Sequence, residues 1–229
     1  MNFGIFGTGM VGQAIAGKLA ELGHSVVIGT RDVEATLANT SPNAYGLPPF
    51  SAWYKQQTKV KLGTFTGAAA HGEMLVNCSS GVASLDALKS AGEKNLNSKI
   101  LIDISNPLDF SKGFPPSLTV CNTDSLGEQI QRAFLEIKVV KTLNTVNAMV
   151  MVNPTLVPGD HNLFICGNDS DAKDSVMNLL KSFGWKEANI IDLGDITNAR
   201  ATEMLLPIWV RLYGKLQTPF FNFNVVVGK

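Results

Sequence analysis

The stretch Gly7-Thr8-Gly9-Met10-Val11-Gly12 decides the fold that this sequence predicts. It follows the apolar run Asn2–Phe6, which is typical of a short buried strand. It opens the segment Met10–Leu22, whose apolar residues recur with helical spacing until Gly23 ends it. A glycine motif alone is a weak signal, but a glycine-rich turn between a strand and a helix is the fingerprint of a dinucleotide-binding unit.

Each glycine of this motif has a physical role in such a unit. Gly7 permits the tight turn, Gly9 lets the backbone approach a pyrophosphate, and Gly12 lets the helix pack close to the sheet. The free N–H groups and the positive dipole end of the helix then face the phosphates. A glycine-rich turn that binds nothing is the alternative. We predict that the whole motif contacts the cofactor, namely Gly7, Thr8, Gly9, Met10, Val11 and Gly12.

The end of the second expected strand, Ser25–Ile28, indicates which dinucleotide is bound. NAD sites usually carry an acid there to hold the ribose hydroxyls, whereas this chain has Thr30 and Arg31. A hydroxyl and a guanidinium suit a 2′-phosphate, because arginine can bond two phosphate oxygens at once. We therefore predict NADP(H), bound by Thr30 and Arg31. Asp32 is expected to cap the helix Val33–Leu37, although it could instead be an NAD-type acid shifted by one or two positions.

The rhythm of strands and helices predicts an α/β fold, a Rossmann-type doubly wound parallel sheet with helices on both faces. We assign residues 1–160 to the NADP-binding domain and 161–229 to a small C-terminal α/β extension packed on it. The extension holds a long apolar helix, Asn198–Tyr213, that Pro207 should kink, and a tail of strand composition, Phe220–Val227. Further strands are expected at Val60–Leu62, Met74–Asn77, Ile100–Ile104, Lys138–Leu143, Asn162–Cys166 and Asn189–Leu193, and further helices at Gly81–Ala91, Leu126–Phe134 and Ser170–Phe183.

Small polar residues follow three of the later strands. Ligands of open α/β sheets bind at the carboxyl ends of the strands, so we predict that these residues hold the nicotinamide half. Ordinary turn chemistry is the alternative. Two loop-like segments that also follow strands, 40–51 and 106–117, are expected to be ligand-binding loops, and the first is placed to close over the adenine. The predicted residues are Asn77, Cys78 and Ser79, then Asn106 and Pro107, then Asn144 and Thr145.

Composition excludes several classes of partner. The 229 residues contain 19 Lys and Arg and 19 Asp and Glu, so the chain lacks the basic field of a nucleic-acid-binding protein. No apolar run has the length of a membrane span or a signal peptide. The three cysteines match no zinc or redox spacing. We expect a cytoplasmic protein with reduced thiols, no metal site, and no nucleic-acid or membrane partner.

No catalytic side chain is predicted. His24, His71 and His161 lie at expected turns or at a strand start, and no nucleophile elbow or metal-ligand pattern occurs. Hydride transfer between two bound cofactors needs no such group, because the protein only holds two rings face to face. Two alternatives stay open. One is a dehydrogenase of a small substrate, with Lys141 as its best-placed acid–base group. The other is a non-catalytic NADP(H) sensor.

The chain resembles the deazaflavin (coenzyme F420)-dependent NADP reductase family. Besides the glycine motif, the likeness rests on Gly29-Thr30-Arg31, Ser105-Asn106-Pro107-Leu108-Asp109-Phe110, Pro116-Ser117-Leu118, Val139-Val140-Lys141-Thr142-Leu143-Asn144-Thr145-Val146 and Ala199-Arg200-Ala201-Thr202-Glu203-Met204-Leu205-Leu206-Pro207.

This resemblance implies a homodimer in which NADP(H) exchanges hydride with a flat flavin-like ring, either F420 or FMN. It also implies that positions matching Thr30 and Arg31 hold the NADP phosphate. The pocket for the second ring has no compact motif to carry over. Relatives with this sheet also form the reductase half of membrane ferric reductases, a function not expected of a chain without membrane helices.

Overall fold

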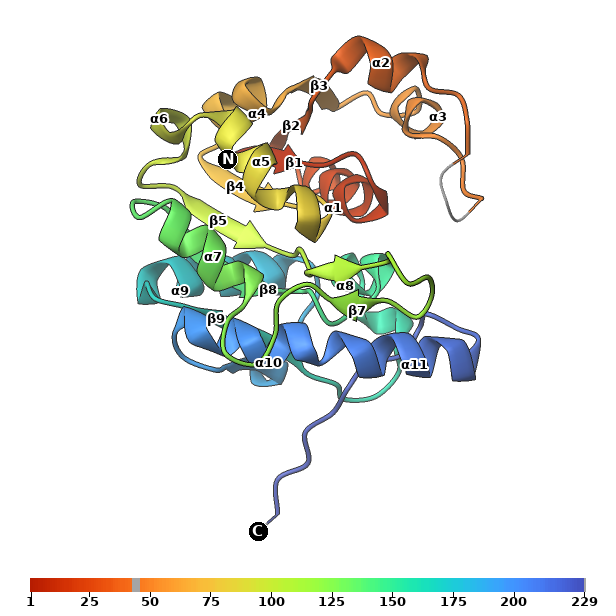
Figure 1. The fold of residues 1–229 in the computed structure, drawn as a ribbon, viewed down its shortest axis with the longest axis vertical. Coiled ribbons are helices and arrows are strands. Elements are labelled where there is room, and N and C mark those ends of the chain that lie inside the picture. The colour runs from red at the N-terminus through yellow and green to blue at the C-terminus, as the bar shows by residue number, and fades with distance from the viewer. Residues whose placement is uncertain (43–45, 229) are drawn as a thin grey trace.

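A computed structural model describes residues 1–42 and 46–228 of the protein, folded around one eight-stranded sheet (Figure 1). The strand order is β10-β9-β8-β5-β4-β1-β2-β3. Neighbouring strands run parallel, except that β9 runs antiparallel to β8. The predicted Rossmann-type α/β fold is confirmed. The strands are β1 (Asn2–Phe6), β2 (Ser25–Thr30), β3 (Val60–Thr64), β4 (Met74–Asn77), β5 (Ile100–Asp103), β8 (Lys138–Thr142), β9 (Leu163–Gly167) and β10 (Ile190–Asp192).

Alternating side chains of the central strands supply two cores, one on each face of the sheet. On β1, Phe3 and Ile5 join one core and Phe6 joins the other, all without solvent exposure. Burying a side chain of this size contributes about 1.5–3 kcal/mol, so β1 is held from both sides. The glycine motif therefore begins at a fixed point in the middle of the sheet.

Helices cover both faces of the sheet, as expected for a doubly wound fold. The apolar side chains of α1 share the first core with α3, α8 and α9, and those of α4, α5, α6 and α7 share the second. A short hairpin, β6 (Leu108–Asp109) with β7 (Ser117–Leu118), begins in the loop predicted over 106–117 and ends one residue beyond it. The helices are α1 (Met10–Glu21), α2 (Val33–Ala38), α3 (Phe50–Tyr54), α4 (Phe65–His71), α5 (Gly81–Ala91), α6 (Glu93–Leu96), α7 (Leu126–Ala133), α8 (Ala148–Val152) and α9 (Ser170–Ser182).

The last third of the chain adds to the same sheet, because β9 and β10 continue it beyond β8. The boundary at residue 160 stays a prediction. The long apolar helix is interrupted as expected: α10 (Ala199–Met204) and α11 (Leu206–Leu216) meet at Leu205, with Pro207 in the first turn of α11. No helix among the described residues is long and apolar enough to cross a membrane.

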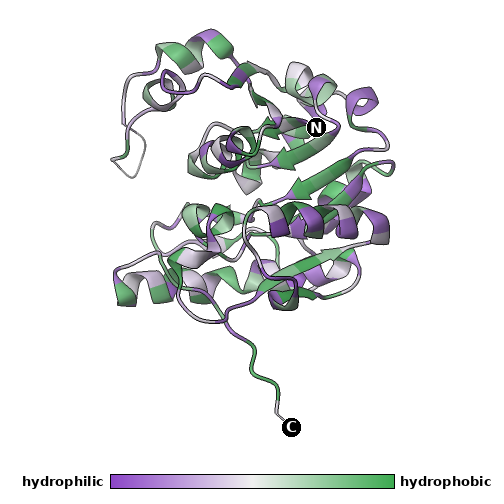
Figure 2. Cartoon of the chain, turned by 180° about the vertical axis from the view of Figure 1, so that it is seen from behind, coloured by the Kyte–Doolittle hydropathy of each residue, from purple (hydrophilic) through white to green (hydrophobic). Residues whose placement is uncertain are grey.

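The prediction of a strand in the tail Phe220–Val227 is wrong. Residues 219–228 form neither helix nor strand. Phe221 stacks on Trp209 and Asn222 bonds Asn162, and the end of the tail then leaves the body of the molecule beyond α10 and α11 (Figure 1). Figure 2 shows that this projecting segment is largely hydrophobic. Valine and phenylalanine favour strands, but a strand needs a ladder of backbone hydrogen bonds with a neighbouring strand. Here the Asn162 N–H donates to the Phe223 carbonyl at 2.8 Å, and no strand ladder forms at the described residues of the tail.

Candidate functional site

The glycine loop has the geometry that a bound pyrophosphate requires. Gly7 has a φ of +117°, and a Cβ at Gly12 would collide with the carbonyl oxygen of Gly7, so neither position tolerates a side chain without a shift. Gly9 caps α1 without any side-chain hydrogen bond. A Cβ at Gly9 would meet no atom within 4 Å. Open space in front of a helix N-terminus with free N–H groups is what a phosphate group would fill.

Thr30 and Arg31 stand at the end of β2, beside the glycine loop. The Thr30 hydroxyl lies 2.8 Å from the hydroxyl of Thr36, which donates to the carbonyl of Asp32 at 2.6 Å. Arg31 is exposed, and it has no hydrogen bond or ion pair with any of the residues 1–42 and 46–228. Its guanidinium is thus available to an anionic ligand.

Asp32 serves the helix that follows, as the sequence indicated. It is the N-cap of α2, and its carboxylate accepts the Ala35 N–H at 2.9 Å. An acid committed to a helix cap has one oxygen less to offer a ribose. The geometry therefore favours Thr30 and Arg31 over Asp32 as the residues that select the cofactor.

A cavity of about 480 Å³ lies at the carboxyl ends of β1, β2 and β4. The end of β2, the glycine loop and the loop after β4 all line it, so residues far apart in sequence face one space. Two smaller cavities, of about 350 and 270 Å³, also reach Thr30 and Arg31. Of the predicted cofactor-binding residues, the 480 Å³ cavity brings together Gly7, Thr8, Gly9, Thr30, Arg31, Cys78 and Ser79.

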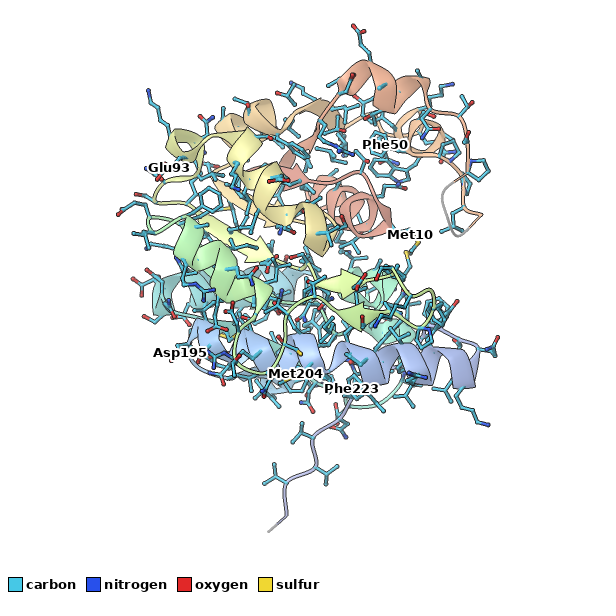
Figure 3. All side chains as sticks on the ribbon, in the orientation of Figure 1. Met10, Phe50, Glu93, Asp195, Met204 and Phe223 are labelled. Atoms are coloured by element: carbon cyan, nitrogen blue, oxygen red, sulfur yellow. The ribbon has the colours of Figure 1, made fainter. Side chains whose placement is uncertain are left out.

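Other predicted residues lie elsewhere. Gly12 is buried and Val11 is partly buried in α1. Met10 is 41% exposed and projects from the start of α1 (Figure 3), where it lines a different cavity of about 870 Å³ between α1 and α8. That cavity is larger, but it runs along the outer face of α1 rather than over the glycine loop.

The loop 40–51 is described only in part, because residues 43–45 lie outside the described chain. Asn39, which directly precedes the loop, and Phe50, near its end, line the 350 Å³ cavity together with Thr30 and Arg31. The two ends of this loop thus stand beside the predicted phosphate-binding residues, and whether the loop covers the adenine stays a prediction.

Asn77 lies beneath the cavity floor rather than in it. Its side chain is fully buried and donates to Asp103 at 2.9 Å, while its oxygen accepts the Ser79 hydroxyl at 2.6 Å and the Ser79 N–H at 3.2 Å. Ser105 donates to the same Asp103 oxygen at 2.6 Å. Asn77 therefore shapes the loop after β4 from below, and Ser79 is the member of this network that reaches the cavity.

Lys141 is buried in a set of charges between β5, β8 and α10. Its ammonium lies 2.8 Å from a carboxylate oxygen of Asp103 and 2.8 Å from one of Glu203, with the three side chains almost completely buried. Burial acts to lower the pKa of Lys141, but the two carboxylates outweigh it, so the pKa is raised. An enclosed ammonium whose pKa is raised stays charged at neutral pH, so it acts as a structural cation and is poorly suited to exchange protons with a substrate.

The loops after β5 and β8 are tied to each other. The Asn106 amide donates to the Asn144 carbonyl at 2.8 Å, and the Asn144 amide donates to the Asn106 side-chain oxygen at 3.0 Å. Pro107 and Thr145 are buried beside them. None of these four residues lines the 480 Å³ cavity, so their predicted contact with the nicotinamide half stays a prediction.

The histidines are engaged away from the cavity. Burial lowers the pKa of His24, which packs edge-on against Phe3 with 5.0 Å between ring centroids. His71 hydrogen-bonds Ser25 at 3.1 Å, and His161 is held between the Pro154 carbonyl and Asn222. The described lining of the 480 Å³ cavity includes no histidine and no lysine.

Cys78 faces the cavity, but its surroundings disfavour the thiolate. Burial, followed by the negative charge of Asp103, raises the pKa of Cys78 far above the ordinary thiol value. Burial also raises the pKa of Cys166, to about 12. A thiol that stays protonated contributes a small apolar surface to the cavity and is a weak nucleophile.

Sequence reasoning missed one wall of the cavity, which is formed by one side of α5 along its length together with Phe65. The helix was predicted, but its facing side could not be known without the order of the strands. The unpredicted lining residues are Gly29, Phe65, Ser80, Val82, Ala83, Asp86, Ala87 and Ser90.

Comparison with known proteins places the chain in context. Residues 2–107 match the family described as NADP oxidoreductase, coenzyme F420-dependent. The F420-dependent NADP reductase of Methanothermobacter marburgensis is 27% identical over 90% of this chain and 89% of that protein. The metalloreductase STEAP3 of Rattus norvegicus is 26% identical over 90% of this chain, which corresponds to 37% of that protein.

A solved structure is similar over the full length. The crystal structure of a candidate F420-dependent NADP reductase from Arthrobacter sp. FB24 is 54% identical to this chain, covers 99% of it and 100% of that chain, and superposes with a TM-score of 0.93. Sequence identity of this extent, together with the family match over the glycine loop and the cavity, identifies the family. The chain belongs to the coenzyme F420-dependent NADP oxidoreductases.

Proposed function

We propose that this protein transfers hydride between NADP(H) and a flat flavin-like acceptor, with F420 as the first candidate and FMN as the second. The observation that carries the proposal is that one cavity joins open space at Gly9 to an Arg31 side chain that has no hydrogen bond or ion pair with the described residues. The first suits a pyrophosphate and the second a 2′-phosphate. The names of the family and of the Methanothermobacter relative support F420 as the acceptor.

The orientation of the dinucleotide follows from the order of the strands. β1 lies between β2 and β4, so a 2′-phosphate at Arg31 and a pyrophosphate at Gly9 direct the other half toward β4, β5 and β8. The bound nicotinamide would supply the hydride. The chain would hold its ring against the acceptor near the loops of Ser79, Asn106 and Asn144, since proximity and orientation are the main demands of such a transfer.

The position of Lys141 argues against the dehydrogenase of a small substrate. Such an enzyme needs a positioned acid or base, and Lys141 is enclosed by Asp103 and Glu203 instead. Transfer between two rings makes no such demand. This contrast supports the flavin-like acceptor over a small hydroxyacid or imine.

The reaction is tested by mixing the protein with NADPH and F420 without oxygen and following the absorbance of both. We expect one F420 to be reduced for each NADPH oxidised, with FMN as the comparison acceptor. The Gly9→Ala variant is the matched control, because it should fold and yet bind NADPH poorly. NADPH that binds tightly but reduces no acceptor would instead support the NADP(H) sensor.

We further propose that two copies of the chain form a homodimer in the cytoplasm. Support comes from apolar side chains that face solvent on α11 and on the tail: Ile208 is 47% exposed, Val226 85% and Val227 84%. Three free thiols suit a reducing compartment. Light scattering should give twice the chain mass for the wild type and the single-chain mass after removal of residues 226–229. A monomeric wild type would contradict the dimer.

A further inference from the structure

We propose that the Ser79 hydroxyl is a hydrogen-bond acceptor for a ribose hydroxyl of the dinucleotide, with its polarity set by a buried chain of hydrogen bonds that begins at Lys141. The inference rests on the proposed function and adds to it a residue that distinguishes a ribose from a phosphate. Serine hydroxyls in nucleotide sites can donate or accept, so the direction of this one decides what it can bind.

The chain of hydrogen bonds begins at an ammonium with no free proton. Lys141 has three N–H groups, and they meet Asp103 at 2.8 Å, Glu203 at 2.8 Å and the Ser105 carbonyl at 2.5 Å. Asp103 shares this buried ion pair as a carboxylate, and a carboxylate accepts hydrogen bonds only. Every group that faces Asp103 must therefore donate to it.

Asn77, the last residue of β4, donates a hydrogen bond on one side and accepts on the other, so the carboxylate of Asp103 fixes the orientation of its amide. Only the amide nitrogen of Asn77 can face the carboxylate, and it donates to Asp103 at 2.9 Å. The amide oxygen then points the other way, toward the loop, where it accepts the Ser79 N–H at 3.2 Å and the Ser79 hydroxyl at 2.6 Å. Because Asn77 and Asp103 are both fully buried, water cannot relax this arrangement.

The single proton of the Ser79 hydroxyl is thus directed inward. The Ser84 hydroxyl lies 3.0 Å from the Ser79 hydroxyl and also reaches the Ser80 carbonyl at 3.2 Å, to which it can donate its one proton. Whichever of the two accepts that proton, at least one lone pair of the Ser79 oxygen remains for a ligand. Ser79 lines the 480 Å³ cavity together with Thr8 and Gly9. Its oxygen therefore presents an acceptor to the ligand, which repels a phosphate oxygen and attracts an O–H group.

The place of Ser79 in the sheet indicates which donor of the ligand it meets. The loop of Ser79 follows β4, the strand next to β1, whose loop would hold the pyrophosphate. In a dinucleotide the two riboses flank the pyrophosphate, one on either side. A ribose hydroxyl is therefore the donor nearest to Ser79. With the 2′-phosphate at Arg31 after β2, the ribose on the β4 side of the pyrophosphate is that of the nicotinamide half.

The experiment measures dissociation constants of NADPH and of 2′,5′-ADP, which has only the adenosine ribose, for the wild type, Ser79→Ala and Ser79→Thr. Loss of the hydroxyl should weaken NADPH binding about three- to tenfold, and threonine should restore it. A loss for NADPH alone is expected and assigns the nicotinamide ribose, whereas an equal loss for 2′,5′-ADP would assign the adenosine ribose and contradict the proposed orientation. The melting temperature without ligand checks that the variants fold alike.

Polarity is tested with analogues of the assigned ribose. Replacing its hydroxyl by hydrogen should weaken binding to the wild type as much as Ser79→Ala does, and the two losses should not add. Fluorine accepts but does not donate, so the fluoro analogue should bind no better than the deoxy analogue. A Ser79→Ala variant that binds NADPH like the wild type overturns the inference while the proposed function stands. A wild type that does not bind NADPH overturns both.

Discussion

Asn106 and Asn144 bind each other in both directions, with the Asn106 amide 2.8 Å from the Asn144 carbonyl and the Asn144 amide 3.0 Å from the Asn106 side-chain oxygen. The two residues follow β5 and β8, which are neighbours in the sheet. Their pairing fixes the distance between two loops that the proposed nicotinamide half must reach. It also accounts for amide side chains at two positions that are 38 residues apart.

Removing one partner should leave the other unsatisfied. We expect Asn106→Ala to lower the free energy of unfolding by about 1–3 kcal/mol, because buried polar groups of Asn144 lose their partners. Urea denaturation measures the loss. Asn97→Ala is the control, since Asn97 is exposed and should change stability by less than about 0.5 kcal/mol. Equal effects of the two substitutions would show that the pairing contributes nothing.

The buried ion pairs of Lys141 predict a larger effect. Lys141→Met leaves Asp103 and Glu203 as uncompensated buried charges, which typically costs about 3–5 kcal/mol. Lys186→Met is the matched control, because Lys186 pairs with Asp160 on the surface, where both side chains are about 70% exposed and such pairs contribute about 0–1 kcal/mol. A variant of Lys141 as stable as that of Lys186 would contradict the structural role.

The same residue predicts a dependence on pH. The pKa of Lys141 is raised in the folded protein above its ordinary value of 10.5, so its contribution is complete below that value and is lost as the pH rises through the folded pKa. The stability difference between the wild type and Lys141→Met should therefore stay constant from neutral pH to about pH 10 and shrink only above it. A difference that already shrinks near neutral pH would mean that Lys141 titrates there.

Alanine variants of three glycines in α1 and its preceding loop distinguish an effect on folding from an effect on ligand binding. Gly12→Ala should unfold or distort the loop, because its Cβ would meet the Gly7 carbonyl, whereas Gly9→Ala has open space and should fold normally. Gly17→Ala is the control, since its Cβ would also meet nothing within 4 Å and should stabilise the helix by up to about 1 kcal/mol.

NADPH titration of these variants gives the outcome. We expect Gly9→Ala to bind NADPH at least about tenfold more weakly, because its methyl group occupies the place of the pyrophosphate, and Gly17→Ala to bind like the wild type. Undiminished binding to Gly9→Ala would remove the pyrophosphate from this loop. Circular dichroism of each variant confirms that the comparison is between folded proteins.

The cysteines should differ in reactivity. Burial and Asp103 raise the pKa of Cys78, whereas Cys121 is exposed. Because alkylation requires the thiolate, iodoacetamide at mildly alkaline pH should modify Cys121 first and Cys78 much more slowly, as read by peptide mass spectrometry. Modification of Cys78 at the rate of Cys121 would indicate an opening of the loop after β4.

The sequence predicted each strand of the eight-stranded sheet, because the buried apolar runs are local signals. β1, α1 and β2 were found because buried runs, a glycine motif and helical spacing occur within 30 residues of one another. The antiparallel direction of β9 could not be predicted, since apolar patterns carry no direction. The tail at Val226 and Val227 was assigned to a strand because composition reports propensity and does not report whether a neighbouring strand exists.

The residues of the candidate site that belong to a local sequence motif were predicted from the sequence. Those that reach the site only through tertiary packing were missed. Gly9, Thr30 and Arg31 were assigned from their place after β1 and β2, and the cavity joins them. The α5 wall, including Asp86, depends on how the crossover after β4 packs, which no local pattern reveals. The inward direction of Asn77 likewise depends on Asp103, which lies 26 residues further along the chain.

The most direct test of the account is a titration of the wild type and Arg31→Ala with NADPH and with NADH. Loss of a charge-assisted contact to the 2′-phosphate should weaken NADPH binding by about 1.5–3 kcal/mol and leave NADH nearly unchanged. Arg211→Ala, which removes an exposed arginine of α11, should alter neither affinity. If the wild type prefers NADH, or if Arg31→Ala binds NADPH as tightly as the wild type, then the assignment of NADP(H) to this cavity is wrong.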